Sequence, residues 1–321
     1  MSRPRIAPLL TGLGPILGLL VLGCASVDLG PTGSAQPRSH QVADVPFIAQ
    51  SARQCGPAAL AMALQHAGLA LTEADVAPAV FTPDRRGSFA QDLVGAARRL
   101  GHVPYPIADF ASLFDEVRAG SPVVVLQNLG LSWLPRWHFA VVIGFDLDRG
   151  TLTLHSGSRA ARSIPLFLFA RTWNRADRWG RVILPPEELP ASLPERDVLA
   201  AVAPLESMGQ GAAARVAYGA AAARWPQSSA ARMGLGNASY AQGDKKAAEV
   251  AFREALELDP ALIPAANNLA HLLGETGRPA EGRALLEPRL ETAGAWRPTL
   301  ERTLRSLAPR EGSGEPKGPT D

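Results

Sequence analysis

The pattern of hydrophobic and polar positions changes near residue 190, which divides the chain into two regions. In the first region, three stretches with apolar residues at helical spacing predict helices at 56–68, 89–100 and 110–119. Five apolar runs predict strands at 122–127, 138–145, 151–154, 164–169 and 181–184. Asp148-Arg149-Gly150 is a turn signal that predicts a hairpin between the second and third strands. Helices followed by an antiparallel sheet indicate an α+β domain.

After residue 190 the sequence repeats with a period of 34 residues. The glycines expected at the turn inside each unit are Gly209, Gly243 and Gly277. The unit 229–262 carries the motif that resembles a tetratricopeptide repeat, Leu235-Gly236-Asn237, Ala248, Phe252, Ala255 and Pro260. We expect an all-α tetratricopeptide-repeat solenoid over 195–306, with further units at 195–228 and 263–296; a generic Ala-rich bundle is the alternative. The resemblance implies binding of a protein partner.

The N-terminus has the three parts of an export signal over residues 1–23. Arg3 and Arg5 precede an apolar stretch that is too short and broken for a transmembrane helix. The stretch ends at Val21-Leu22-Gly23-Cys24, which resembles the lipobox of bacterial lipoproteins. That resemblance implies lipidation of Cys24, and hence contact with a membrane through a lipid anchor. An ordinary secretory signal with a chance cysteine is the alternative.

Ala25 follows the cysteine, and in the lipoprotein resemblance a residue other than Asp favours the outer membrane. We therefore expect a lipid-anchored protein of the bacterial envelope that faces the periplasm. Residues 24–43 are rich in Ser, Gly and Pro and predict a tether, whereas 307–321 predict a disordered tail. The chain has two cysteines, so lipid on Cys24 leaves Cys55 without a disulfide partner.

The net charge and the spacing of the histidines bear on whether the chain binds nucleic acid or a metal ion. The net charge is +2, and loss of Arg3 and Arg5 with the signal brings it to 0. No basic run with interleaved aromatic residues occurs, so we do not expect nucleic acid as a partner. His40, His66, His102 and His271 show no metal-ligand spacing with cysteine, and we expect no metal or other cofactor.

A candidate catalytic cysteine lies in Cys55-Gly56-Pro57, at the start of the first predicted helix. Unpaired main-chain N–H groups and the positive end of a helix dipole stabilise a thiolate. Gly56 would let a substrate approach the backbone, and Pro57 suits the first turn of a helix. A thiolate needs a proton acceptor, and His138 begins a predicted strand where it could line a cleft.

These residues, with Gln50 five positions before Cys55, resemble the bacteriocin-processing cysteine peptidases that cut after double-glycine leaders. The resemblance covers about 44–190 and implies a papain-like fold. It implies Cys55 as nucleophile, His138 as general base and then acid, and Gln50 as oxyanion donor, with Gln54 as the fallback. A peptide or protein is the substrate that it implies.

This sequence departs from the resembled family at the third catalytic residue. In the family that residue is an Asp about one hairpin after the His. Folding the hairpin about 146–150 places His155-Ser156-Gly157 opposite His138, with no carboxylate. Ser156 could accept a hydrogen bond from the imidazole, or the site could work as a dyad. We expect hydrolysis of peptide bonds by a thiol protease, with the repeats recruiting the substrate or a partner; an inactive peptide-binding scaffold and acyl or amide transfer on the same fold are the alternatives. The best-known members of the resembled family are fused to transporters driven by ATP, whereas this sequence has no Gly-x4-Gly-Lys-Ser/Thr phosphate-binding loop. The double-glycine substrate is therefore not carried over.

An aromatic segment, Leu131-Ser132-Trp133-Leu134-Pro135-Arg136-Trp137, immediately precedes His138. We hypothesise that it forms one lip of the cleft and grips an extended apolar segment of the substrate. Ordinary packing of these side chains under the sheet is the alternative.

Overall fold

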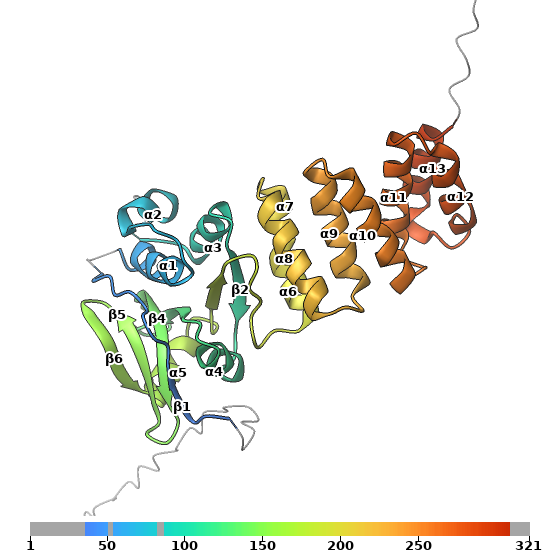
Figure 1. Cartoon of the computed structure of the whole chain (residues 1–321). Coiled ribbons are helices and arrows are strands. Elements are labelled where there is room, and N and C mark those ends of the chain that lie inside the picture. The colour runs from blue at the N-terminus through green and yellow to red at the C-terminus, as the bar shows by residue number, and fades with distance from the viewer. Residues whose placement is uncertain (1–35, 51–53, 82–86, 309–321) are drawn as a thin grey trace, which may run out of the picture.

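The computed structural model describes residues 36–50, 54–81 and 87–308. The predicted export signal, Cys24 and the residues after 308 lie outside this range, so their predictions are not addressed by the structure. Within it, a sheet with flanking helices is followed by a row of helices that extends away from it (Figure 1).

The sheet of the first domain is antiparallel throughout. Its strands run in the order β2-β7-β3-β4-β5-β6, and β1 pairs with β4 outside this path. Their bounds are β1 Ser39–Gln41, β2 Val103–Ile107, β3 Val123–Asn128, β4 Trp137–Asp146, β5 Thr151–Ser156, β6 Arg159–Pro165 and β7 Gly180–Leu184. The long hairpin of β4 and β5 therefore lies between β3 and the edge strand β6.

Helices pack on both faces of this sheet. One face is covered by α1 (Cys55–His66), α2 (Glu73–Val80) and α3 (Ala90–Arg99), and the other by α4 (Phe110–Arg118) and α5 (Leu166–Asn174) (Figure 1). Alternation along β4 produces the two cores: Phe139, Val141 and Ile143 pack on the α1 side, whereas Ala140 and Val142 pack on the α5 side.

The structure confirms the α+β class and most predicted elements, but the strand predicted at 164–169 is wrong. There the chain leaves β6 and enters α5, whose buried residues Leu166, Phe169, Ala170 and Trp173 follow a helical period. A short apolar run does not distinguish a strand from a buried helix. The sequence reading also missed β1, α2, β2 and β6; two prolines inside β2 mask its strand pattern.

The domain also begins earlier than the predicted boundary at residue 44. Strand β1 pairs with β4, and Val42 is buried in the core. The last part of the predicted tether, 39–43, therefore belongs to the fold. At the other end, Leu307 is buried against the last helices, so the folded region extends past the predicted end at 306.

The second region is helical, as predicted. Its α-helices are α6 Glu195–Val202, α7 Pro204–Ser207, α8 Gly211–Arg224, α9 Ser229–Ala241, α10 Lys245–Leu258, α11 Ile263–Glu275, α12 Pro279–Leu286 and α13 Arg297–Ser306. Gly209, Gly243 and Gly277 have φ of 74°, 79° and 79°, the left-handed conformation that ends a helix most readily at glycine. The 34-residue period therefore corresponds to helix–turn–helix units.

The first helical unit is joined to the sheet domain through a shared core. Val198, Val202 and Leu205 are buried in the same cluster as residues of β2, and α6 contacts that strand. Buried Glu116 of α4 accepts hydrogen bonds from the main-chain N and the hydroxyl of Ser192, in the connection between the domains. The degenerate sequence of 195–228 is thus explained, because this unit packs against a sheet as well as against the next repeat.

Candidate active site

Cys55 is the first residue of α1 and is half-buried. It packs against the core on the α1 side of the sheet, as do Phe47, Ile48 and Trp179. Among the described residues its sulfur takes part in no hydrogen bond. The unpaired N–H groups of the first helical turn lie beside the thiol, which is the setting expected to favour a thiolate.

Gly56 has a structural role that the sequence did not indicate. A Cβ on this residue would collide with the side chain of Ser88, which approaches the start of α1. The hydroxyl of Ser88 is buried without a hydrogen-bond partner in the described part of the chain. The absent side chain of Gly56 therefore makes room for Ser88 rather than for a substrate.

His138 is the second residue of β4 and opposes Gln127 of β3. Its Nε2 shares a hydrogen bond of 2.9 Å with the hydroxyl oxygen of Ser156, from the end of β5. The predicted pairing of these two residues across the hairpin is therefore confirmed. Because Nε2 is engaged, Nδ1 is the ring nitrogen that is left to receive a proton from a thiol.

The strand alternation places His138 on the α5 side, while Cys55 packs on the α1 side. The two can meet only at the end of the sheet, where β4 begins. Within the described residues, no hydrogen bond joins them in this structure. Among the described residues, the structure thus pairs His138 with Ser156 and not with Cys55.

The surroundings of His138 disfavour its charged form. Burial lowers the pKa of the imidazole, and the positive charges of Arg162 and Arg136 lower it further. A hydroxyl at the Ser156 position offers no charge to oppose these two arginines. These surroundings therefore favour the neutral imidazole, the form that can accept a proton.

His155 has a structural role. Its Nε2 bonds to the carbonyl of Val45 at 3.1 Å, and the N–H of Ala161 donates to its Nδ1 at 3.0 Å. Both ring nitrogens are thereby used by main-chain groups, and burial lowers the pKa of the ring. Its alternation with Ser156 turns it to the opposite face, so it does not replace the family's Asp.

Gln50 fastens the segment before α1 to the hairpin that carries His138. Its N–H donates to the carbonyl of Gly157 at 2.9 Å, and the N–H of Gly157 donates to its Oε1 at 2.9 Å. Its Nε2 donates to the carbonyl of Phe139 at 3.2 Å. Gln50 thus bonds the chain neighbours of both His138 and Ser156, a positioning role, and only one Nε2 hydrogen is left for the predicted oxyanion contact.

Gln54 is the amide that stays available beside Cys55. It is exposed and occupies the N-cap of α1, where its side chain makes no capping hydrogen bond. It also lines a groove with Thr72, Ala77 and Phe81 of the α2 region. Of the two amides named from the sequence, Gln54 is the one whose side chain makes no hydrogen bond within the described residues.

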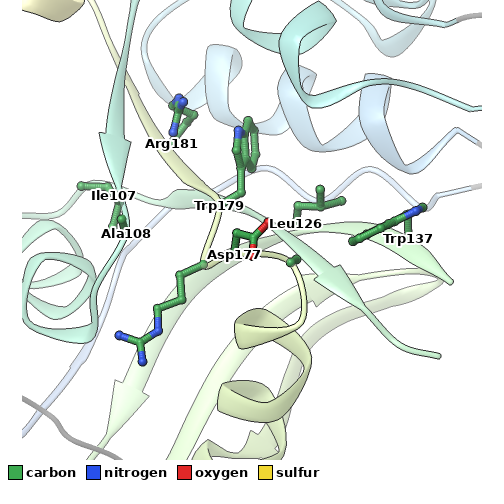
Figure 2. Close-up of a pocket in the computed structure, with 9 residues that line it drawn as sticks. Ile107, Ala108, Leu126, Trp137, Asp177, Trp179 and Arg181 are labelled. Atoms are coloured by element: carbon green, nitrogen blue, oxygen red, sulfur yellow. The ribbon is translucent and has the colours of Figure 1, made fainter. Parts of the chain in front are cut away.

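An apolar pocket of about 280 Å³ opens beside the start of β4. Figure 2 shows Trp137, Leu126 and Trp179 around it, with Ile107 and Arg181 toward its other side. Trp137 is the neighbour of His138 in the chain, and alternation along β4 turns the two side chains to opposite faces of the strand. The pocket has the apolar lining and few polar groups that are typical of a site for a substrate side chain.

Trp133 is 78% exposed, at the tip of a turn closed by two hydrogen bonds between Leu131 and Leu134. The alternative that it packs under the sheet is wrong. Leu129, Leu131, Leu134 and Trp137 are also exposed, so the segment presents an apolar surface that leads to the pocket. The structure is compatible with the predicted lip, and its grip on substrate stays a prediction.

Gln127 and Asn128 form hydrogen bonds beside the start of β4, a role that the sequence did not predict. Buried Gln127, opposite His138, donates from Nε2 to the hydroxyl of Thr172 at 2.6 Å. The Oδ1 of Asn128 accepts from the N–H of Arg136 and the N–H of Gly130. Only the register between β3 and β4 shows that these polar residues hold the strand that bears His138.

The described residues contain no group of three or more His, Cys, Asp or Glu that could hold a metal ion. In the same residues, no helix is long and apolar enough to span a membrane.

Comparison with known proteins identifies both parts of the chain. Residues 42–178 match the Peptidase_C39 like family, and residues 229–262 match the tetratricopeptide repeat. The chain carries a C39-like peptidase domain. The repeat match coincides with the unit predicted from the 34-residue period. No curated protein matches the chain.

Two solved structures are similar to the C39-like domain. One is described as a C39-like peptidase from Bacillus anthracis, with 19% identity over 46% of this chain and 97% of that chain and a TM-score of 0.40. The other is the peptidase domain of Streptococcus ComA, a bifunctional ABC transporter of a quorum-sensing pathway. It has 24% identity over 44% of this chain and 98% of that chain, with a TM-score of 0.36.

Proposed function

We propose that the chain is a cysteine peptidase that hydrolyses peptide bonds, with Cys55 as nucleophile and His138 as base. The observation that carries this proposal is the placement of Cys55 at the start of α1 together with the His138–Ser156 hydrogen bond of 2.9 Å. The thiol would transfer its proton to Nδ1 of His138 and attack the substrate carbonyl. His138 would then protonate the leaving amine, and water would release the acyl group from the thioester.

The developing oxyanion would be stabilised by the N–H groups at the start of α1 and by Gln54. Gln50 would hold the segment before α1 against the hairpin. The pocket beside Trp137 would receive an apolar side chain of the substrate. The repeats would recruit a protein substrate or partner, the usual use of such surfaces.

We further propose that the chain acts in the bacterial envelope, anchored through lipid on Cys24 at the outer membrane. The Val21-Leu22-Gly23-Cys24 sequence supports this location. Radiolabelled palmitate should enter the wild-type chain in cells and should not enter a Cys24→Ser variant.

An inactive peptide-binding scaffold is the second candidate, and two observations favour it. Ser156 stands where the family has a carboxylate, and Cys55 makes no hydrogen bond within the described residues. Incubation with a proteome-derived peptide mixture separates the two functions. New peptide N-termini that appear with the wild type and not with Cys55→Ser support hydrolysis. Binding of peptides without new N-termini supports the scaffold.

A further inference from the structure

Four arginines lie on segments that neighbour the His138–Ser156 pair: Arg136, Arg159, Arg162 and Arg175. Arg159 opposes Ser156 in the register of β5 and β6, and Arg162 opposes Leu154, two residues before it. The N–H of Arg136 donates to Asn128, whose carbonyl accepts from the guanidinium of Arg175. Asn128 in turn opposes Trp137, next to His138. We call these four residues the arginine cluster.

The arginine cluster has no internal counter-charge. Across the described residues, none of its members forms an ion pair, although many other arginines of the chain do. The position where a carboxylate would balance the charge beside His138 is occupied by Ser156. Asp177 lines the pocket with Trp137 but forms no ion pair with the cluster. The excess positive charge therefore lies at the site itself and is exposed to an arriving ligand at Arg136, Arg159 and Arg162.

We infer that the arginine cluster binds a carboxylate of the substrate, so that the peptide bond presented to Cys55 is flanked by an acidic group. Guanidinium groups pair with carboxylates through charge-assisted hydrogen bonds. A substrate carboxylate would supply the negative charge that the site lacks, and it would favour the imidazolium that forms when His138 accepts the proton. This inference rests on the proposed function, because it names the substrate class of the same site.

The test uses two reagents that differ mainly in charge, iodoacetate and iodoacetamide, on the full chain. In both reactions the Cys55 sulfur forms a bond to carbon while the carbon–iodine bond breaks and iodide leaves. The measured quantity is the rate with iodoacetate divided by the rate with iodoacetamide, relative to the same ratio for free cysteine. Labelling is followed on the peptide that contains Cys55, so that Cys24 does not contribute.

At low salt we expect a relative ratio of about 10. This value is at the lower end of the rate enhancements that charged clefts produce for ligands of opposite charge. It should fall toward 1 in 0.5 M NaCl, where charges are screened. Arg162→Gln and Arg136→Gln should each lower it severalfold. Arg149→Gln is the matched control, an exposed arginine at the opposite end of the same hairpin that pairs with Asp146, and it should leave the ratio unchanged. A wild-type ratio near 1, or equal ratios in all variants, would overturn the inference.

Protection experiments identify the source of the carboxylate. The tripeptides are acetyl-Gly-Glu-Gly-amide, acetyl-Gly-Gln-Gly with a free C-terminus, and acetyl-Gly-Gln-Gly-amide, each present during reaction with iodoacetamide. Protection by the first indicates an acidic side chain, and protection by the second indicates a terminal carboxylate. No protection by either charged peptide, or equal protection by all three, would overturn the inference. Loss of the iodoacetamide reaction in His138→Ala tests the proposed function separately, since that reagent carries no charge.

Discussion

His138 and Ser156 share a hydrogen bond of 2.9 Å across the β4–β5 hairpin, at the position where the resembled family places a carboxylate. This contact fixes the imidazole orientation and frees Nδ1 for the thiol. It supplies no charge, and Arg162 and Arg136 oppose protonation of the same ring. The site therefore has a hydrogen-bond partner for the imidazole but no carboxylate that would stabilise its charged form.

Replacing Ser156 with Asp should restore that support. A carboxylate in contact with Nε2 favours the imidazolium, so the pKa of His138 should rise. The measurement is the titration of the His138 ring by NMR in the wild type and in Ser156→Asp. Ser156→Ala is the control. It should remove the hydrogen bond to Nε2 of His138 without raising the pKa of the imidazole. An unchanged His138 titration in Ser156→Asp would show that residue 156 does not act on the base.

Substitutions of Gln50 and Gln54 should have different effects, the first on the free energy of unfolding and the second on peptide hydrolysis. Gln50→Ala removes side-chain bonds to Phe139 and Gly157, so the free energy of unfolding should fall by about 1–3 kcal/mol. Gln54→Ala removes an exposed side chain without a capping bond and should leave stability within about 0.5 kcal/mol. If Gln54 donates to the oxyanion, its loss should lower kcat by about 100-fold or more. Urea unfolding and peptide hydrolysis measure the two effects, and equal stability losses would contradict the assignment.

The stability of the fold should decrease in mild acid because of two histidines. The pKa values of His138 and His155 are both lowered from the ordinary 6.5, mainly by burial. As the pH falls below about 7, the unfolded chain binds these protons before the folded chain does, so the free energy of unfolding falls. Glu116, whose pKa is raised by burial, acts in the opposite direction at lower pH.

Urea unfolding between pH 5 and pH 8 measures this slope, and His155→Gln isolates one contribution to it. The variant should show a shallower decline than the wild type, whatever its absolute stability. Parallel curves for the two proteins would mean that His155 does not titrate differently on folding.

Two glycines in the helical region offer a matched test of repeat packing. A Cβ at Gly236 would come within 2.5 Å of the Phe252 ring, so Gly236→Ala should lower the free energy of unfolding by about 1–3 kcal/mol. Gly219 of α8 has open space around its Cα, so Gly219→Ala should raise it by up to about 1 kcal/mol through helix propensity. Thermal unfolding compares the pair, and a stable Gly236→Ala would contradict the close packing of α9 on α10.

Much of this architecture could be predicted from the sequence because its signals are local. The helix that begins at Cys55, the β4–β5 hairpin and the 34-residue units each follow from spacing or from turn residues such as Gly243. The hairpin alone was sufficient to place Ser156 beside His138. Such features depend on residues that are near one another in the chain.

The parts that sequence reasoning missed depend on distant contacts. The sequence predicted Gln50 as an oxyanion donor, yet its side-chain amide hydrogen-bonds to residues 89 and 107 positions away. Arg159 and Arg162 carried no signal until β6 was found beside β5. The run at 164–169 has the same apolar composition in a strand or a buried helix, and packing against the sheet decides for α5.

Alkylation of Cys55 by iodoacetamide as a function of pH tests the central claim most directly, in the wild type and in His138→Ala. Cys55→Ser is the blank, and labelling is read on the peptide that contains residue 55. If His138 receives the thiol proton, the wild type should react readily near neutral pH, and His138→Ala should require a distinctly higher pH for the same rate. Identical pH–rate profiles for the two proteins, or a thiol that does not react at any pH, would contradict a peptidase that works through Cys55 and His138.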